Sequence, residues 1–217
     1  MSTLSNVDEH IYVRLEAAAS LARQGNEYGV AFIKSCLTDS YLQNRLEAVI
    51  VLGEIATEVA GQLLIDVLLD SKQHSEIRAG AAWALGELHD ESAITALINS
   101  FIAVDNEIRI EAARALAKLA SQFTSDILQK LPESSPEKRP GIAWALSKSG
   151  RFVLQDMLDI LVDDDARQWV AYVLGTQDQQ RFLHEIERLK AQDREVYFAV
   201  TVLWKIMTNW VYGLEEY

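Results

Sequence analysis

The stretch Arg78-Ala79-Gly80-Ala81-Ala82-Trp83-Ala84-Leu85-Gly86 decides the fold of this chain, because versions of it recur along the sequence. The shared pattern is an arginine followed by small residues at the third, fourth and sixth positions, a leucine at the seventh and often a glycine at the eighth. Copies start at Arg14, Arg45, Arg78, Arg109, Arg139 and Arg167, and a degenerate copy spans residues 196–204. The leucines, from Leu21 to Leu203, follow one another at intervals of 28 to 33 residues. Seven copies in one register predict a tandem repeat.

Each copy is expected to form a helix, with a second helix between successive copies. Small residues on one side of the motif let neighbouring helices approach closely, and the leucine one turn later fills the remaining space. The segments 60–69, 93–102 and 152–161 carry apolar residues three and four positions apart, which is the helical period. Neither helix of such a pair can bury its apolar side alone, so stacked pairs are expected to share one continuous core.

Acidic residues precede several of the arginines, namely Asp39, Asp70, Asp105 and the run 163–165. With the alanine-rich helix that follows, this pattern resembles HEAT repeats, in particular the short HEAT-like repeats of the phycobilin-lyase type, over about residues 10–207. The resemblance implies an all-α fold, an α-solenoid of the HEAT/armadillo-like type with about seven helical hairpins in a right-handed superhelix. It implies little about function, because the family contains scaffolds, adaptors and a few enzymes.

We expect a single HEAT-like repeat domain over residues 1–217. Its motif helices, meaning those that carry the arginine pattern, are expected near residues 10–24, 42–57, 75–89, 106–121, 137–149, 165–176 and 193–209. The aromatic and apolar residues after Leu203 are expected either to fold back and seal a monomer, or to form a homodimer or partner interface.

The composition indicates a folded, acidic protein. Of the 217 residues 49% are hydrophobic and 24% are charged, and the formal net charge is −12. This charge disfavours nucleic acid, which binds lysine- and arginine-rich faces, and favours basic or neutral protein partners. The start of the chain lacks the basic and apolar run of a signal peptide, and no stretch is apolar for the roughly eighteen residues that span a bilayer. With Cys36 as its only cysteine, expected to be a buried thiol, the chain is predicted to be cytoplasmic and not to bind membranes.

No catalytic residue, cofactor or metal site is predicted. The four histidines lie in different repeats, and none belongs to a His-Glu pair like those that the resemblance associates with metal-dependent hydroxylases. The sequence also lacks a glycine-rich phosphate loop and a Gly-x-Ser-x-Gly elbow. The arginine column is interpreted as an internal ladder, made either of ion pairs or of contacts to turn carbonyls. The acidic run 163–165 lacks the spaced ligands of a calcium loop, so it is expected to cap the helix of Arg167.

The second, fifth and ninth positions after each arginine are three and four residues apart and therefore share one side of the motif helix. In HEAT arrays the second helix of each pair lines the concave surface, so the resemblance implies that these positions meet a partner. Across the copies, the residues at these three positions are acidic in the N-terminal half of the chain and aromatic and mildly basic in the C-terminal half. The predicted partner-binding residues are Trp83, Trp144, Trp169, Tyr172, Arg114, Glu47, Glu54, Glu87 and Glu111.

Two motif helices carry a glycine three residues before a tryptophan, Gly80 with Trp83 and Gly141 with Trp144. Glycine inside a helix costs about 1 kcal/mol relative to alanine, so it usually marks packing or close approach. Each tryptophan either lies flat over its glycine and offers a partner its aromatic face, or fills a gap between adjacent units.

The leading hypothesis is a non-catalytic scaffold or adaptor that binds a protein or peptide with basic and apolar side chains. One alternative, implied by the resemblance alone, is a subunit of a phycobilin (tetrapyrrole) lyase. A metal-dependent hydroxylase is a third and weaker alternative.

Overall fold

The computed structural model describes residues 4, 6, 8–151, 156, 157, 160 and 163–176, with the single residues 180, 184, 187, 188, 191 and 201 beyond them. Within these residues the chain forms ten α-helices and two short 3-10 turns, and no strand. The predicted all-α fold class is confirmed.

Each of the first six copies of the arginine motif lies on a helix of its own. These motif helices are α2 (Ile11–Arg23), α4 (Leu42–Ile55), α6 (Ser75–Leu88), α8 (Asn106–Ala120), α10 (Arg139–Lys148) and α12 (Asp164–Gly175). Between them lie α3 (Glu27–Cys36), α5 (Glu58–Leu69), α7 (Ile94–Asn99) with its flanking 3-10 turns η1 (Glu91–Ala93) and η2 (Ser100–Ile102), and α9 (Thr124–Glu133). This alternation is that of an α-solenoid of helical hairpins, as predicted. The seventh copy and the helix expected near residues 193–209 lie outside the described residues.

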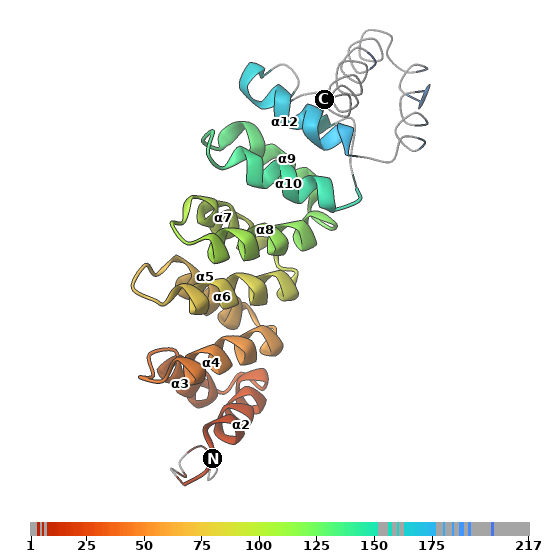
Figure 1. The fold of residues 1–217 in the computed structure, drawn as a ribbon. Coiled ribbons are helices and arrows are strands. Elements are labelled where there is room, and N and C mark those ends of the chain that lie inside the picture. Colours follow the sequence, from red (N-terminus) through yellow and green to blue (C-terminus); the bar gives the residue numbers. More distant parts are fainter. Residues whose placement is uncertain are drawn as a thin grey trace. The chain divides into compact units, whose positions relative to one another are not determined.

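The chain divides into two compact units, residues 1–118 and 119–217. In the first unit α2 contacts α4 and α4 contacts α6, so the motif helices form one layer, and α3 and α5 pack on it as a second layer (Figure 1). In the second unit α10 contacts both α9 and α12. The single repeat domain and the right-handed superhelix stay predictions.

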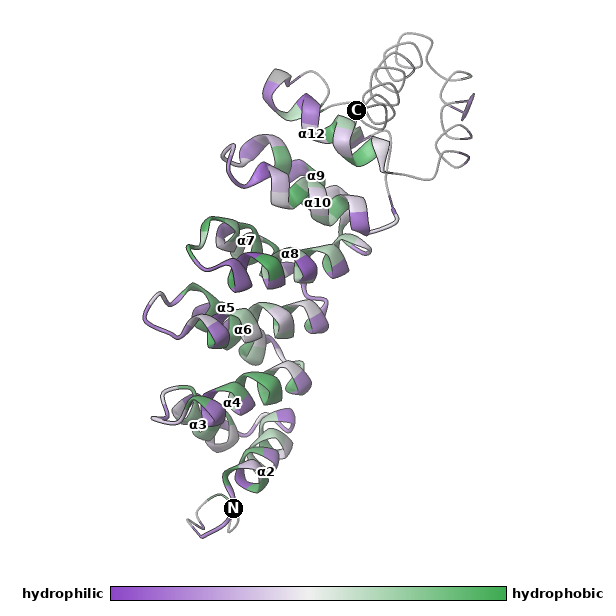
Figure 2. Cartoon of the chain, viewed as in Figure 1, coloured by the Kyte–Doolittle hydropathy of each residue, from purple (hydrophilic) through white to green (hydrophobic). Residues whose placement is uncertain are grey.

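The repeated positions of the motif build the buried side of the motif helices. In α4 these positions are Ala48, Val49, Val51 and Leu52, and each exposes 1% of its surface or less. Of the equivalent residues in α6 and α8, Ala113 is half-buried and the others are buried: Ala81, Ala82, Ala84, Leu85, Ala112, Ala115 and Leu116. Figure 2 shows hydrophobic and hydrophilic residues alternating along these helices, as expected for helices with one buried side. Burial of one leucine side chain stabilises the fold by roughly 1.5–3 kcal/mol, so the leucine column is a main source of stability.

The glycine at the eighth position allows close contact with the next motif helix. A Cβ at Gly86 would lie 2.8 Å from Cα of Ala115, which is closer than real Cβ atoms come. A Cβ at Gly53 would lie 3.1 Å from Cβ of Ala84. In both cases the eighth position of one motif meets the sixth position of the next, so the repeated glycine is explained by helix approach.

The first copy buries a partly different set of motif positions. In α2 the buried residues are Leu15, Ala18, Ala19 and Ala22, at the first, fourth, fifth and eighth positions. Leu21 is only half-buried, so the buried leucine column starts at Leu52. α2 packs tightly on α3, because a Cβ at Gly29 would lie 2.5 Å from the carbonyl oxygen of Ala18. The arginine of the first copy keeps the role of the others, since Arg14 Nε donates to the carbonyl of Leu4 at 3.1 Å.

Candidate partner-binding face

The arginine column has a structural role. Arg78 Nε donates to the carbonyl of Leu68 at 2.8 Å, and Arg109 Nη1 donates to the carbonyl of Ala103 at 2.6 Å. Arg139 donates from Nε and Nη2 to two carbonyls before it, at 3.0 and 3.1 Å. These carbonyls lie where the preceding helix ends, and there the last carbonyls lack helical partners and carry partial negative charge. Of the two predicted alternatives, contacts to turn carbonyls are confirmed for these three arginines, and ion pairing is wrong for them.

Arg45 reaches the preceding helix through a neighbouring side chain. Its Nη1 donates to Oε1 of Gln73 at 3.3 Å, and Nε2 of Gln73 donates to the carbonyl of Leu37 at 3.2 Å. Gln73 lies in the turn of the next helical hairpin, so this arrangement also joins two successive repeats. Among the residues that the structure describes, the buried Nε of Arg45 finds no hydrogen-bond partner.

The acidic residues before the motif helices cap backbone N–H groups. Asp39 Oδ1 accepts a hydrogen bond from the N–H of Tyr41 at 2.8 Å, and this bond is the main reason that the pKa of Asp39 lies below its usual value. Asp163 Oδ1 accepts hydrogen bonds from two N–H groups in the first turn of α12, both at 2.9 Å. The predicted acidic cap of α12 is confirmed. Cys36 is buried, as predicted, and burial raises the pKa of its thiol.

The outward side of three motif helices in the first unit, hereafter the α4–α8 face, comprises Glu47, Ile50, Glu54, Trp83, Glu87, Glu111, Arg114 and Lys118. At the fifth positions Ile50 exposes 37% and Trp83 41% of their surface, and the side chain of Arg114 exposes 62%. Among the predicted acidic residues Glu54 and Glu87 are exposed, whereas Glu47 and Glu111 are half-buried. Ala19, at the fifth position of α2, is fully buried, so α2 does not continue this face at that position.

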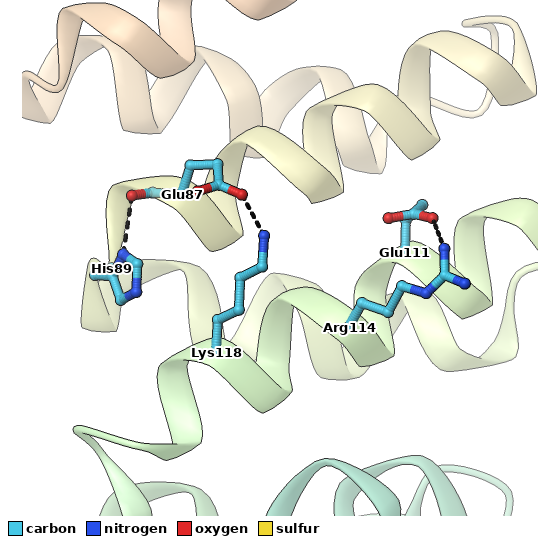
Figure 3. Close-up of polar contacts among 5 residues, drawn as sticks. All are labelled: Glu87, His89, Glu111, Arg114 and Lys118. Atoms are coloured by element: carbon cyan, nitrogen blue, oxygen red, sulfur yellow. Dashed lines mark hydrogen bonds and ion pairs between the residues drawn. The ribbon is translucent and has the colours of Figure 1, made fainter. Parts of the chain in front are cut away.

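Equal repeat positions of neighbouring motif helices lie side by side on this face. Lys118 of α8 forms an ion pair with Glu87 of α6, and both residues hold the ninth position of their motifs (Figure 3). Arg23 Nη2, at the ninth position of α2, donates to the carbonyl of Glu54 at 3.4 Å. The fifth-position residues Ile50 and Trp83 are expected to be neighbours in the same way.

Ion pairs neutralise only part of the α4–α8 face. Two such pairs lie on it, Lys118 with Glu87, and Arg114 Nη1 with Glu111 Oε1 at 2.6 Å (Figure 3). Within the described residues no ion pair reaches Glu47 or Glu54. Within the described residues, the carboxylates without an ion pair on this face therefore lie on α4, while the two basic residues that α8 places on the face, Arg114 and Lys118, are paired.

The packing around Gly80 is directed toward α4. A Cβ at Gly80 would meet side chains of α4, Val49 at 3.6 Å and Leu46 at 3.7 Å, and no side-chain atom of Trp83 lies within 4 Å of that position. Gly80 thus faces the neighbouring helix. With 41% of its surface exposed, Trp83 is not a core residue that fills a gap between units.

The predicted aromatic residues of the second unit lie on α10 and α12, which contact each other. Tyr172 exposes 43% of its surface, whereas Trp144 and Trp169 are half-buried. The ammonium nitrogen of Lys148 lies 5.8 Å from the centroid of the Trp144 ring, within the range of a cation–π contact. That these residues form one binding stretch with Trp83 stays a prediction.

Three of the four histidines have local roles in helix ends. His10 and His74 cap α2 and α6, because each Nδ1 accepts a hydrogen bond from an N–H of the first turn, at 3.4 and 3.3 Å. His89 ends α6 with a φ of 52°, and its Nδ1 lies 2.9 Å from the carbonyl oxygen of Glu87 (Figure 3). In the described part of the chain, no group of three or more His, Cys, Asp or Glu side chains is placed to hold a metal ion.

A shallow hollow that sequence reasoning missed lies at the C-terminal halves of α3 and α5. Its volume is about 150 Å³, and it is lined by Lys34, Leu37, Thr38, Leu63, Asp66, Val67, Asp70 and Gln73. Sites for small molecules usually measure about 300–1,000 Å³, so this hollow has room for one side chain rather than for a cofactor. The sequence carries no signal for it, because its lining residues come from separate segments of two repeats.

Two family profiles match the first half of the chain. Residues 2–75 match the family described as HEAT repeats, and residues 77–101 match the PBS lyase HEAT-like repeat. Both profiles describe repeats of the HEAT type. The resemblance inferred from the arginine motif is thereby confirmed. No curated protein sequence matches the chain. Among the described residues, no helix has the length and apolar character that a membrane crossing requires.

Several solved structures are similar to this chain at low sequence identity. Human deoxyhypusine hydroxylase, in complex with glycerol, is 17% identical, with 94% of each chain covered and a TM-score of 0.42. The complex of CpcE and CpcF of phycocyanin lyase from Nostoc sp. PCC7120 is 17% identical, with 95% of this chain and 92% of that chain covered and a TM-score of 0.42. The archaeal HEAT-like repeats protein from Thermococcus onnurineus NA1 is 17% identical, with 90% and 93% covered and a TM-score of 0.39. The activities named here are those of the similar proteins.

Proposed function

We propose that this chain is a non-catalytic binding module, a scaffold or adaptor, whose α4–α8 face takes a protein or peptide segment with basic and apolar side chains. The observation that carries the proposal is the position of Trp83, which exposes 41% of its surface between an acidic helix and a helix with paired charges. Tryptophan is among the residues that most often dominate the free energy of binding at protein interfaces. A partner that covers this ring removes apolar surface from water.

The packing beneath the face supports the same function. Leu52 and Leu85, one turn or less from the outward residues, expose 1% and 0% of their surface, and the glycine contacts hold α4, α6 and α8 close together. A face carried by packed helices is already ordered before it binds. Association then costs less conformational entropy than it does for a loop that must become ordered.

A photo-reactive benzoylphenylalanine at position 83 tests the proposal, with the same group at position 59 as its control. Val59 exposes 53% of its surface but lies on α5, in the other helical layer. We expect position 83 to crosslink a specific protein in the native lysate, identified by mass spectrometry, and position 59 not to crosslink it. Capture of this protein is expected to be lost in Trp83→Ala and kept in Val59→Ala, with circular dichroism showing that both variants are folded. Equal crosslinking from the two positions, or capture that survives Trp83→Ala, contradicts the proposal.

A second candidate function is handling of a tetrapyrrole as part of a lyase. The observation that favours it is the match of residues 77–101, which include Trp83, to the PBS lyase HEAT-like repeat. Mixing the chain with a bilin and recording the visible absorbance tests this candidate. A red-shifted spectrum that Trp83→Ala abolishes supports it, and an unchanged bilin spectrum rejects it for the chain by itself.

A further inference from the structure

We infer that the α4–α8 face recognises a polyproline II segment in which a basic and a large apolar side chain lie three residues apart. The basic side chain pairs with Glu47 or Glu54 on α4, and the apolar side chain packs on Trp83 of α6. This inference rests on the proposed function, because it names the partner chemistry of the same face.

The distribution of ion pairs indicates that the basic side chain of the partner binds at α4. The carboxylate of Glu111 is held by Arg114 at 2.6 Å, and that of Glu87 by Lys118, so neither needs a charge from a partner. Within the described residues no ion pair holds the carboxylate of Glu47 or Glu54, because Arg23 donates to the backbone carbonyl of Glu54, at 3.4 Å, and not to its carboxylate. The chain as a whole carries a net charge of −12. A cation from a partner is therefore drawn to α4 more strongly than to α6 or α8.

The shape of α6 places the apolar side chain on Trp83. At the second position of this motif α6 has Gly80, where α4 and α8 have Glu47 and Glu111. Because Gly80 faces Val49 and Leu46 and has no side chain of its own, no carboxylate stands one turn before Trp83 on α6. An apolar side chain of a partner can contact the ring there without displacing a charged group.

The spacing of the helices sets the spacing within the partner. Packed helix axes lie about 8–10 Å apart, and the close approach of Gly53 to Ala84 puts α4 and α6 in such contact. In a polyproline II segment residues i and i+3 share a face and lie about 9 Å apart. Neighbours on one face of an extended strand are about 6.6 or 13 Å apart instead. The polyproline II spacing is the one that reaches from α4 to α6.

A random-peptide phage library selected on the immobilised full chain, and counter-selected on Trp83→Ala, tests the inference. Peptides whose binding depends on Trp83 are expected to share a lysine or arginine three positions from a large apolar residue, in either order. Proline is expected to be tolerated at the two positions between them, because polyproline II backbone needs no N–H donor there.

A peptide from this selection is then measured by fluorescence anisotropy against matched variants. The double variant Glu47→Gln/Glu54→Gln is expected to bind it about three- to fivefold more weakly, with the loss shrinking at high salt, since both pairs are near the surface. Glu58→Gln/Glu91→Gln removes the same charge from exposed positions on α5 and η1 and is expected to leave the affinity unchanged. Trp83→Ala is expected to weaken binding about thirtyfold.

The outcomes separate this inference from the proposed function. Trp83-dependent peptides without a basic residue, or with another spacing, overturn the inference and leave the proposed function standing. Equal weakening by the two glutamate double variants also overturns it, because the attraction then comes from the overall charge. A selection that yields no Trp83-dependent peptide counts against both.

Discussion

On their buried sides α4 and α6 carry the same kinds of residue, whereas on their outward sides they share almost none. Ala48, Leu52 and Gly53 of α4 correspond to Ala81, Leu85 and Gly86 of α6. On the outward side, the second and fifth positions are Glu47 and Ile50 in α4 but Gly80 and Trp83 in α6.

The difference separates two kinds of constraint on one helix. A buried position of a repeat must fit the helix before it and the helix after it, so the same volume recurs in every copy. An outward position faces solvent, so core packing does not restrict its residue type and binding of a partner can determine it. The repeat therefore identifies the core, and the departures from the repeat identify the candidate site.

The largest expected effect on stability comes from shortening a side chain on the buried side of α6. Leu85 exposes none of its surface, so Leu85→Ala is expected to lower the free energy of unfolding by about 2–5 kcal/mol through lost burial and the cavity left behind. Urea unfolding followed by circular dichroism measures it. Trp83→Ala, on the outward side of the same helix, removes more atoms and is nevertheless expected to cost less. An equal or larger cost for Trp83→Ala would assign Trp83 to the core.

The next effect in size concerns the closest helix contact. In Gly86→Ala the new methyl group would start 2.8 Å from Cα of Ala115, and backbone cannot move aside as a flexible side chain can. Overpacking of this kind costs about 1–3 kcal/mol, which outweighs the gain of about 1 kcal/mol in helix propensity. We expect a net loss of stability in the same urea experiment.

A smaller effect is expected from the arginine column. Arg78→Met keeps most of the aliphatic stem but removes the donor that lies 2.8 Å from the carbonyl of Leu68, and we expect a loss of about 1–2 kcal/mol. The matched variant is Arg114→Met, whose ion pair with Glu111 lies at an exposed side chain. Such pairs contribute about 0–1 kcal/mol, so thermal melting is expected to change less for Arg114→Met than for Arg78→Met. The reverse order would mean that the column is not a helix cap.

Much of the fold could be predicted from the sequence, because core packing repeats and repetition is visible in residue types. The alternation of motif helices with a second set follows from this, and so does the carbonyl ladder as one of two alternatives. The burial pattern of α2 could not be predicted. Its motif positions read like those of the other copies, and the close contact of Gly29 on α3 with Ala18 is visible only in the structure.

The candidate site was less predictable, because ion pairs between surface side chains produce no periodic pattern in the sequence. The acidic residues could be assigned to one side of the motif helices from their spacing. The sequence could not tell that Glu87 and Glu111 are held by Lys118 and Arg114 while Glu47 and Glu54 are not, because this depends on contacts between helices.

The smallest expected effect, and the only gain, comes from the glycine on the side of α6 that faces α4. In Gly80→Ala the new methyl group would lie 3.6 Å from Val49 and 3.7 Å from Leu46, which are ordinary contact distances. Nothing has to move, so the change keeps only the benefit of replacing a helical glycine, about 0.5–1 kcal/mol. Gly80→Ala is therefore expected to raise the urea midpoint, and Gly86→Ala, six residues further along the same helix, to lower it. A lower urea midpoint in both variants would show that α6 cannot accept a methyl group at either glycine. In that case packing against α4 would be what requires a glycine at position 80, and the distances to Val49 and Leu46 would be too short for a methyl group.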